Sequence, residues 1–170
     1  MAALEFEPDC QRCDGLCCVA AGFEKSDKFA FTKPAGTPCW NLSAEGRCEV
    51  YDLLAESGLA GCVEYTCFGA GQNLMQNHFP DASWRDGPAA ADEIFRAFYA
   101  LKELHELIFV LRQLVELSPE ARLDRRIEER VAELEALARG EGPPIADVDV
   151  DALRRANQDL VKGVEVARNN

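Results

Sequence analysis

The sequence predicts a mainly α-helical protein, in which an irregular, cysteine-rich N-terminal region packs on a C-terminal three-helix bundle. All eight cysteines of the 170-residue chain lie before residue 68, in a region where glycine and proline interrupt helices and strands. From Pro88 onward apolar residues recur at three- and four-residue steps, which is the period of an amphipathic helix. We therefore expect a cysteine-rich domain at 1–71, a connector at 72–88 and a helical bundle at 89–170.

The cysteine-rich domain is organised around one short segment, Cys10-Gln11-Arg12-Cys13-Asp14-Gly15-Leu16-Cys17-Cys18. Gly15 supplies the backbone freedom that a tight turn between these cysteines requires. The loop Lys33-Pro34-Ala35-Gly36-Thr37-Pro38 leads into Cys39, and two short extended pieces are expected between residues 39 and 51. A region with so little regular structure buries too little apolar surface to fold well without a cross-link.

The connector carries two turn signals, Asn77-His78-Phe79-Pro80-Asp81 and Asp86-Gly87-Pro88. Trp84, between them, is expected to pack back on the preceding domain. Pro88 suits the first turn of a helix because its missing N–H is not needed there. The connector is therefore predicted to be irregular and to end where the first long helix begins.

Three helices are predicted after Pro88. The first carries one apolar stripe, made of Ile94, Phe98, Leu101, Ile108, Leu111 and Val115. Ser118-Pro119-Glu120 predicts a stop and a restart, with Ser118 as the cap of a second helix that Gly140 ends. The stripe of that helix is Leu123, Ile127, Val131, Leu134 and Ala138. Asp149 is expected to cap a third helix with the stripe Leu153, Ala156, Leu160, Val164 and Ala167.

Charge and hydropathy narrow the class of protein. A net charge of −12 and a pI near 4.6, without a cluster of Lys or Arg, argue against nucleic-acid binding. The most apolar run, residues 101–117, is interrupted by charged residues and is not expected to span a membrane. The first nine residues lack the basic and apolar parts of a secretory signal, so a cytoplasmic location is expected. In a reducing compartment clustered cysteines are metal ligands more often than disulfides, although eight thiols would also suit four disulfides.

The cysteine pattern favours a metal centre. Thiolates bind Zn²⁺ and iron–sulfur clusters tightly, and Cys10-x2-Cys13 allows two sulfurs to turn toward one ion. Adjacent Cys17 and Cys18 point their side chains apart and are not expected to serve one ion in the same way. Three arrangements remain open: two four-thiolate zinc sites, a single [4Fe–4S] cluster that leaves other thiols free, or a mixed site with a bridging sulfur. The predicted ligands are Cys10, Cys13, Cys17, Cys18, Cys39, Cys48, Cys62 and Cys67.

The pattern also resembles a known family. The CxxCxxxCC element at 10–18, followed by Cys39-x2-Leu42 and Cys48-x-Val50-Tyr51, is similar to the YkgJ family of bacterial cysteine-cluster proteins. That family is described as a zinc- or iron-chelating domain, and a similar cluster in flagellin lysine methylases is assigned to an iron–sulfur cluster. The family's Arg-Pro before a later cysteine is absent here, because Ala60-Gly61 precedes Cys62. The resemblance implies metal binding and implies no reaction.

A second resemblance concerns the end of the cysteine-rich region. The segment Cys67-Phe68-Gly69-Ala70-Gly71-Gln72, together with residues 33–39, is similar to the cysteine-rich N-terminal region of some bacterial pentapeptide-repeat proteins. No pentapeptide repeat follows in this chain. This likeness implies a shared cysteine-rich module and gives no further role to its residues.

No catalytic residue is predicted. A reactive thiol needs a base or a positive charge nearby, and Arg12, Lys33 and Arg47 offer charge but no histidine is adjacent in sequence. We expect His78 to be a surface turn histidine and His105 to be a packed, hydrogen-bonded one.

Two kinds of function remain. The first is a cytosolic metal-binding protein with a structural or a redox and sensing accessory role. The alternative is a helical interaction protein whose cysteine-rich half is a structural zinc module, or a component of a protein-modifying enzyme system. In that alternative a protein partner binds through the helical half.

Overall fold

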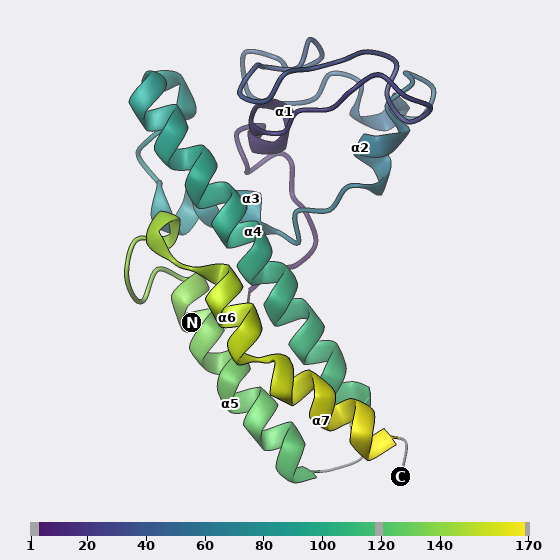
Figure 1. The fold of residues 1–170 in the computed structure, drawn as a ribbon. Helices are drawn as coiled ribbons and strands as arrows, with labels where there is room; N and C mark the ends of the chain where they lie inside the picture. Colours follow the sequence, from purple (N-terminus) through teal and green to yellow (C-terminus); the bar gives the residue numbers. More distant parts are fainter. Residues whose placement is uncertain (1–3, 118–120, 169–170) are drawn as a thin grey trace.

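The computed structural model describes residues 4–117 and 121–168, and it is mainly helical, as predicted (Figure 1). The α-helices are α1 (Leu16–Ala20), α2 (Ala60–Glu64), α3 (Ala70–Asn73), α4 (Pro88–Leu117), α5 (Ala121–Ala138), α6 (Val150–Ala156) and α7 (Gln158–Arg168). Shorter turns are the 3₁₀ segments η1 (Tyr51–Leu53), η3 (Trp84–Asp86) and η4 (Ile145–Asp147), and the π-turn η2 (Leu74–His78). In residues 4–117 and 121–168 β-type pairing is confined to two isolated antiparallel bridges, Phe23 with Lys33 and Leu42 with Cys48.

The 30-residue helix α4 runs through the molecule, and the other elements pack around it (Figure 1). It begins at Pro88, as the sequence predicts. Five residues of the predicted stripe are at most 1% exposed: Ile94, Phe98, Leu101, Ile108 and Leu111. The chain then returns antiparallel as α5, which buries its own predicted stripe of Leu123, Ile127, Val131, Leu134 and Ala138 against α4. The predicted cap at Ser118 lies outside the described residues.

The predicted third helix is two helices, because the chain breaks at Asn157 between α6 and α7. The Asn157 side chain is buried, donates to the carbonyl of Leu153 (2.6 Å) and accepts from Nε of Arg130 (3.1 Å). These bonds place an amide inside the packing, so Ala156, which we expected on the apolar face, is exposed. Asp149 caps α6 as predicted, since its carboxylate accepts from the Ala152 N–H at 2.8 Å.

The connector is more helical than predicted. Helix α3 and the π-turn η2 follow one another directly, where the sequence predicts turns. His78 ends this stretch and is half-buried, with its Nε2 donating to the carbonyl of Ala138 at 2.9 Å. Trp84 packs back on the cysteine-rich region, as predicted, and its Nε1 donates to the carbonyl of Asp14 at 3.0 Å.

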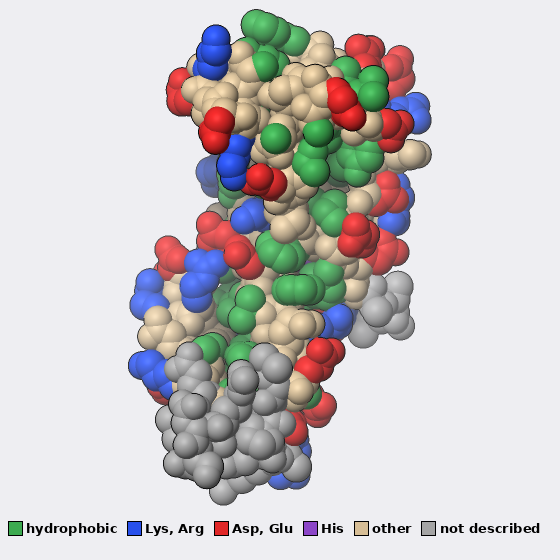
Figure 2. Space-filling model, turned by 90° about the vertical axis from the view of Figure 1, so that its right-hand side faces the viewer, with side chains coloured by type: hydrophobic (Ala, Val, Ile, Leu, Met, Phe, Trp, Pro, Cys, Tyr) green, Lys and Arg blue, Asp and Glu red, His purple; other side chains and the backbone are tan. Residues whose placement is uncertain are grey.

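The N-terminal region forms a lobe of loops with α1 and α2 beside one end of α4 (Figure 1). Figure 2 shows this lobe above the helical part, with a narrower waist between them. Leu16, Ala70 and Leu74 join the core around α4, whereas most buried hydrophobic residues belong to α4 and α5. None of the helices in residues 4–117 and 121–168 combines the length and the hydropathy that a membrane span needs.

Candidate metal centre

All eight cysteines line one cavity of about 850 Å³ in the N-terminal lobe. Each is a free thiol, so the alternative of four disulfides is not realised in this structure. The walls come from the CxxCxxxCC segment, the loops that carry Cys39 and Cys48, α2 and the residues before α3. The fold therefore places around one space thiols that the sequence spreads over residues 10–67.

The turn inside the CxxCxxxCC segment is held by contacts with residues outside that segment. Asp14 and Gly15 both adopt left-handed backbone conformations, with φ of 53° and 67°. The carboxylate of Asp14 forms an ion pair with Arg85 and accepts a hydrogen bond from Ser83 Oγ at 2.9 Å. Gly15 is required not only by its φ, because a Cβ there would lie 2.6 Å from Cδ1 of Leu42. This turn reverses the chain between Cys10-x2-Cys13 and α1, so that both halves of the motif face the cavity.

Cys13 and Cys67 lie side by side over Gly71 of α3, and both are buried. A Cβ on Gly71 would lie 2.8 Å from the Cβ of Cys13, and 3.7 and 3.9 Å from the Sγ atoms of Cys13 and Cys67. Gly71 thus leaves the room that these two sulfurs occupy. Tyr65 borders the same part of the cavity: burial raises the pKa of its hydroxyl, and the nearby thiols of Cys17, Cys67 and Cys13 raise that pKa further.

Cys39, Cys48 and Cys62 come from the outer loops and from α2. The Cys39 N–H donates to the carbonyl of Cys18 at 2.9 Å, which joins its loop to α1. The Leu42 N–H donates to the carbonyl of Cys39 at 3.0 Å, and Leu42 pairs with Cys48 in an isolated bridge. Cys62 lies in α2 and is exposed, but partial desolvation followed by the neighbouring thiols of Cys18, Cys39 and Cys48 raises its pKa to about 11.

A buried ammonium group lies next to the thiols. Lys33 is 4% exposed, and its Nζ donates to the carbonyls of Val19 (3.0 Å), Pro34 (3.2 Å) and Thr37 (2.7 Å). Burial lowers the pKa of Lys33, while the nearby thiolates of Cys39 and Cys18 raise it. A buried charge needs such partners, and here it can offset negative charge on ionised sulfur. The sequence shows Lys33 only as one of three cations near cysteines, because its burial depends on carbonyls from two separate segments.

Four of these thiols, those of Cys13, Cys17, Cys48 and Cys62, have pKa values raised above the ordinary value of a thiol and are protonated near neutral pH. Hydrogen bonding to Cys10 and burial raise the pKa of Cys13, and hydrogen bonding to Cys18 and burial do the same for Cys17. The same contacts act in the opposite direction on Cys10 and Cys18, whose pKa values are lowered by the bonds from Cys13 and Cys17. Since only thiolates bind metal ions, binding at this cavity must displace protons.

The histidines are not part of the cavity wall. His105 is fully buried, and its Nδ1 donates to the carbonyl of Phe68 at 2.7 Å. Its Nε2 accepts from Nδ2 of Asn73 at 2.8 Å, which is the packed and hydrogen-bonded role that the sequence predicts. The cavity therefore offers a metal the eight thiols and the carboxylates of Glu7, Asp9 and Glu64.

The eight cysteines line the walls of the cavity, but their sulfurs do not converge on one point. Among the residues that the structure describes, no three Cys, His, Asp or Glu side chains are arranged to hold one ion. The donor set nevertheless fits a soft metal, because eight free thiols line one cavity. Which metal the cavity prefers is not fixed by the thiols, since Zn²⁺ and iron–sulfur clusters share them as ligands.

Comparison with known proteins finds one similar chain of unassigned function. The protein is 34% identical over 165 residues to Uncharacterized protein YybG of Bacillus subtilis (strain 168). The match covers 96% of this chain and 59% of YybG, so the chain spans about three fifths of that protein's length. Because it covers nearly the whole chain, the match includes both the cysteine-rich lobe and the long helices. No protein-family model matches the chain, and no solved structure matches it.

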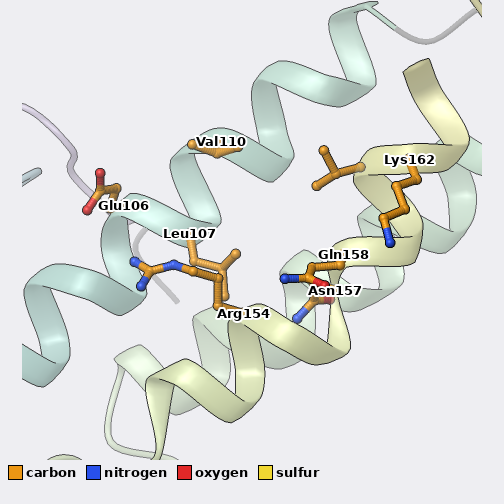
Figure 3. A pocket seen from close by; sticks show the side chains of 8 residues that line it. Glu106, Leu107, Val110, Arg154, Asn157, Gln158 and Lys162 are labelled. Carbon is orange, nitrogen blue, oxygen red and sulfur yellow. The ribbon is translucent and has the colours of Figure 1, made fainter.

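A second, smaller hollow lies in the helical half. It has a volume of about 380 Å³ and is open along the line where α4 meets the last two helices (Figure 3). Leu107 and Val110 of α4 form one side, and Arg154 and Lys162 lie across from them. The groove cannot be predicted from the sequence, because it depends on how the broken third helix packs.

Proposed function

We propose that this protein is a metal-binding cysteine-cluster protein, in which the lobe at 1–71 holds Zn²⁺ or an iron–sulfur cluster and packs on the helical bundle. The observation that carries the proposal is the single cavity lined by all eight free thiols. The resemblance of the CxxCxxxCC segment to metal-chelating proteins supports it. The role of the centre would be structural, or redox and sensing in an accessory protein.

The stability of the lobe gives a physical reason for a metal. Its buried hydrophobic residues are few beside those of α4 and α5, and its backbone is mostly loop. A domain of this size needs staples to fold, and a structural zinc site contributes roughly 10–16 kcal/mol at pH 7. That contribution is as large as the whole stability of a typical domain, which is about 5–15 kcal/mol.

The chain's own residues would perform three tasks. Thiolates of the eight cysteines would bind the metal after losing their protons. Lys33 would offset part of the negative charge that four or more thiolates bring into a buried space. Phe98, Phe109 and Leu16, which also line the cavity, would limit the access of water. The bound group itself would supply a cross-link, or an electron acceptor if it is an iron–sulfur cluster.

Metal content tests the proposal directly. Protein purified without oxygen is analysed for zinc and iron, and its visible absorbance is recorded. Brown protein that contains iron and inorganic sulfide supports the cluster, and colourless protein that retains zinc supports the zinc site. Treatment with a strong chelator should then change the near-UV circular dichroism of the lobe. Protein that retains neither metal and whose spectrum does not respond to added Zn²⁺ would contradict the proposal.

The alternative function, a helical interaction protein, has one observation in its favour. The groove along α4, α6 and α7 leaves Val110 exposed and Val161 partly exposed. A partner helix could bury them. Sedimentation and crosslinking of the purified protein with its groove intact and with Val110→Glu would test this. An unchanged monomer and an unchanged set of crosslinks in both proteins would count against the alternative.

A further inference from the structure

We infer that the eight thiols form two separate four-cysteine sites, so that one chain binds two metal centres. The inner site consists of Cys10, Cys13, Cys17 and Cys67, and it lies next to α3 and α4. The outer site consists of Cys18, Cys39, Cys48 and Cys62, and it lies among the loops and α2. This inference rests on the proposed function, and it specifies which thiols share an ion.

The inner site is assembled on Gly71. The sulfurs of Cys13 and Cys67 both lie within 3.9 Å of the point where a Cβ of Gly71 would be. Sγ of Cys13 also lies 3.5 Å from the carbonyl of Cys10, which brings the two ends of the Cys-x2-Cys pair together. Cys17 follows four residues after Cys13, on α1, and also lines the cavity. Four thiols, a number that suits a tetrahedral ion, thus surround one part of the cavity.

The outer site is assembled by backbone hydrogen bonds. The bond from the Cys39 N–H to the Cys18 carbonyl places the residues Cys18 and Cys39 next to each other. The turn at Leu42 and its bridge to Cys48 bring the third thiol to the same loop. Cys62 completes the set from α2, on the wall of the same cavity. This set also has four members.

The adjacent pair Cys17 and Cys18 is explained by this division. Both lie on α1, where successive residues are rotated by about 100° around the helix axis. The two Cα–Cβ bonds therefore leave the helix in different directions, so one thiol can serve each site once metal binding has replaced the hydrogen bond that joins the two thiols in this structure. The Cys17-Cys18 pair then lies between two neighbouring centres, and each cysteine binds one of them.

Lys33 distinguishes the two sites. Its Nζ donates to the carbonyl of Val19, the residue after Cys18, and to the carbonyl of Thr37, two residues before Cys39. A zinc ion with four thiolates carries a net charge of about −2, which a buried cation reduces. The outer site, which holds this counter-charge, should therefore depend on Lys33, and the inner site should not.

Native mass spectrometry of the full chain with Zn²⁺ as the only added metal tests the division. Wild-type protein should retain two zinc ions. Cys10→Ser/Cys13→Ser should retain one, Cys39→Ser/Cys48→Ser should retain one, and the combined variant none. Each double variant is the control for the other, because both remove two thiols from the same lobe. Far-UV circular dichroism shows in every case whether α4 and α5 remain folded.

Two further variants sharpen the test. In the wild-type background Cys18→Ser should remove one zinc ion and leave one. In the protein that already lacks the inner pair, Cys18→Ser should remove the remaining ion. In that same background Lys33→Met should weaken zinc binding about tenfold, whereas in the background that lacks the outer pair it should leave the affinity unchanged. Equal weakening in both backgrounds would contradict the assignment of Lys33 to the outer site.

The outcomes separate the two proposals. Wild-type protein that retains no metal, zinc or iron, overturns the proposed function itself. If wild-type protein retains metal but either double variant, or Cys18→Ser alone, loses all of it, the thiols form one shared centre. The division into two sites is then wrong, and metal binding stands.

Discussion

At the scale of single residues, Asp14 shows how a side chain inside a metal-binding motif can serve the fold. It lies between Cys13 and Gly15 but does not line the cavity. Its carboxylate instead contacts Ser83 and Arg85, and its carbonyl accepts from Trp84. Arg85 in turn stacks on the Trp84 ring, with 4.0 Å from its Cζ to the ring centroid. The motif is thus attached to the segment that leads into α4.

Substitution of Asp14 should destabilise the protein in two graded steps. Asp14→Asn keeps a residue that tolerates the left-handed backbone but loses the ion pair, and we expect a loss of about 1 kcal/mol. Asp14→Ala also loses the polar side chain that tolerates φ of 53°, and we expect about 2–3 kcal/mol. Urea denaturation followed by Trp fluorescence measures both.

The control for Asp14 is Arg96→Ala, which breaks an exposed pair with Asp92 on α4. That pair should contribute less than about 0.5 kcal/mol, because both of its side chains are in water. Equal stability of Asp14→Ala and the wild-type protein would show that the contacts to Ser83 and Arg85 do not hold the lobe.

His105 makes stability depend on pH. Burial lowers its pKa to about 4, from an ordinary value near 6.5, although the Phe68 carbonyl raises that pKa slightly. Between these two values the unfolded chain binds a proton that the folded chain does not. Stability therefore falls as the pH drops below about 6.5, and the loss is complete near pH 4 at about 3 kcal/mol. Above pH 7 this group has no effect.

The contribution of His105 can be isolated with His105→Gln, whose amide can also donate to Phe68 and accept from Asn73. Free energies of unfolding measured from pH 7 to pH 4 should decline less steeply in this variant than in wild type. Carboxylates contribute equally to both proteins, so the difference between the two curves reports the histidine. Parallel curves would mean that His105 is not kept neutral by burial.

What the sequence could predict at this scale depends on where a residue's partners lie. The eight thiols were recognisable because cysteines cluster along the chain, and the structure places all of them on one cavity. The role of Asp14 was not recognisable, because its partner Ser83 lies 69 residues away. The burial of Lys33 was not recognisable either, because its partners are the backbone carbonyls of Val19 and Thr37. That the thiols bind metal stays a prediction.

At the scale of elements, two glycines in helices are expected to respond oppositely to alanine. Gly163 is inside α7, and a Cβ there would meet Leu123 at 3.4 Å, which is ordinary contact. Gly163→Ala should therefore stabilise the protein by about 0.5–1 kcal/mol. Gly71 in α3 has no such room, because its Cβ would lie 2.8 Å from that of Cys13. Gly71→Ala should cost about 1–3 kcal/mol.

Thermal unfolding of both variants measures the difference, and each is the control for the other because both add one methyl group to a helix. Gly71→Ala should also weaken zinc binding, whereas Gly163→Ala should not. A Gly71→Ala protein as stable as wild type would mean that the sulfurs of Cys13 and Cys67 can move aside without cost.

Elements were predicted correctly where the signals lie in the adjacent backbone, and they were missed where the structure depends on contacts between residues farther apart. Helix α4 begins at Pro88 and α5 ends just before Gly140, because both signals act on the backbone next to them. The break between α6 and α7 was missed, since it depends on the bond from Arg130 of α5 to Asn157. The helical turns of the connector were missed as well, and there the neighbouring Asn77 donates to Asn73 while Asn73 also reaches His105.

At the scale of the whole molecule, the apolar core is distributed unevenly. The helices α4 and α5 bury most of the large hydrophobic side chains, whereas the lobe has the thiol-lined cavity at its centre. Stability should therefore differ between the two parts when no metal is bound, although α1 and α3 both contact α4. The division of the chain into domains at 1–71 and 89–170 is itself a prediction that this difference would test.

Hydrogen exchange of the full chain, with and without bound metal, measures that difference. After chelation the amides of residues 10–67 should lose protection by at least tenfold, while those in the buried parts of α4 and α5 should change little, because their packing does not involve sulfur. The combined variant, which lacks Cys10, Cys13, Cys39 and Cys48, should bind no metal without any chelator and is the control for effects of the chelator itself. Equal loss of protection in lobe and helices would mean that the metal stabilises one cooperative unit. Unchanged protection in the lobe would mean that its loops are stable without metal, and the structural role of the cysteines would then be wrong.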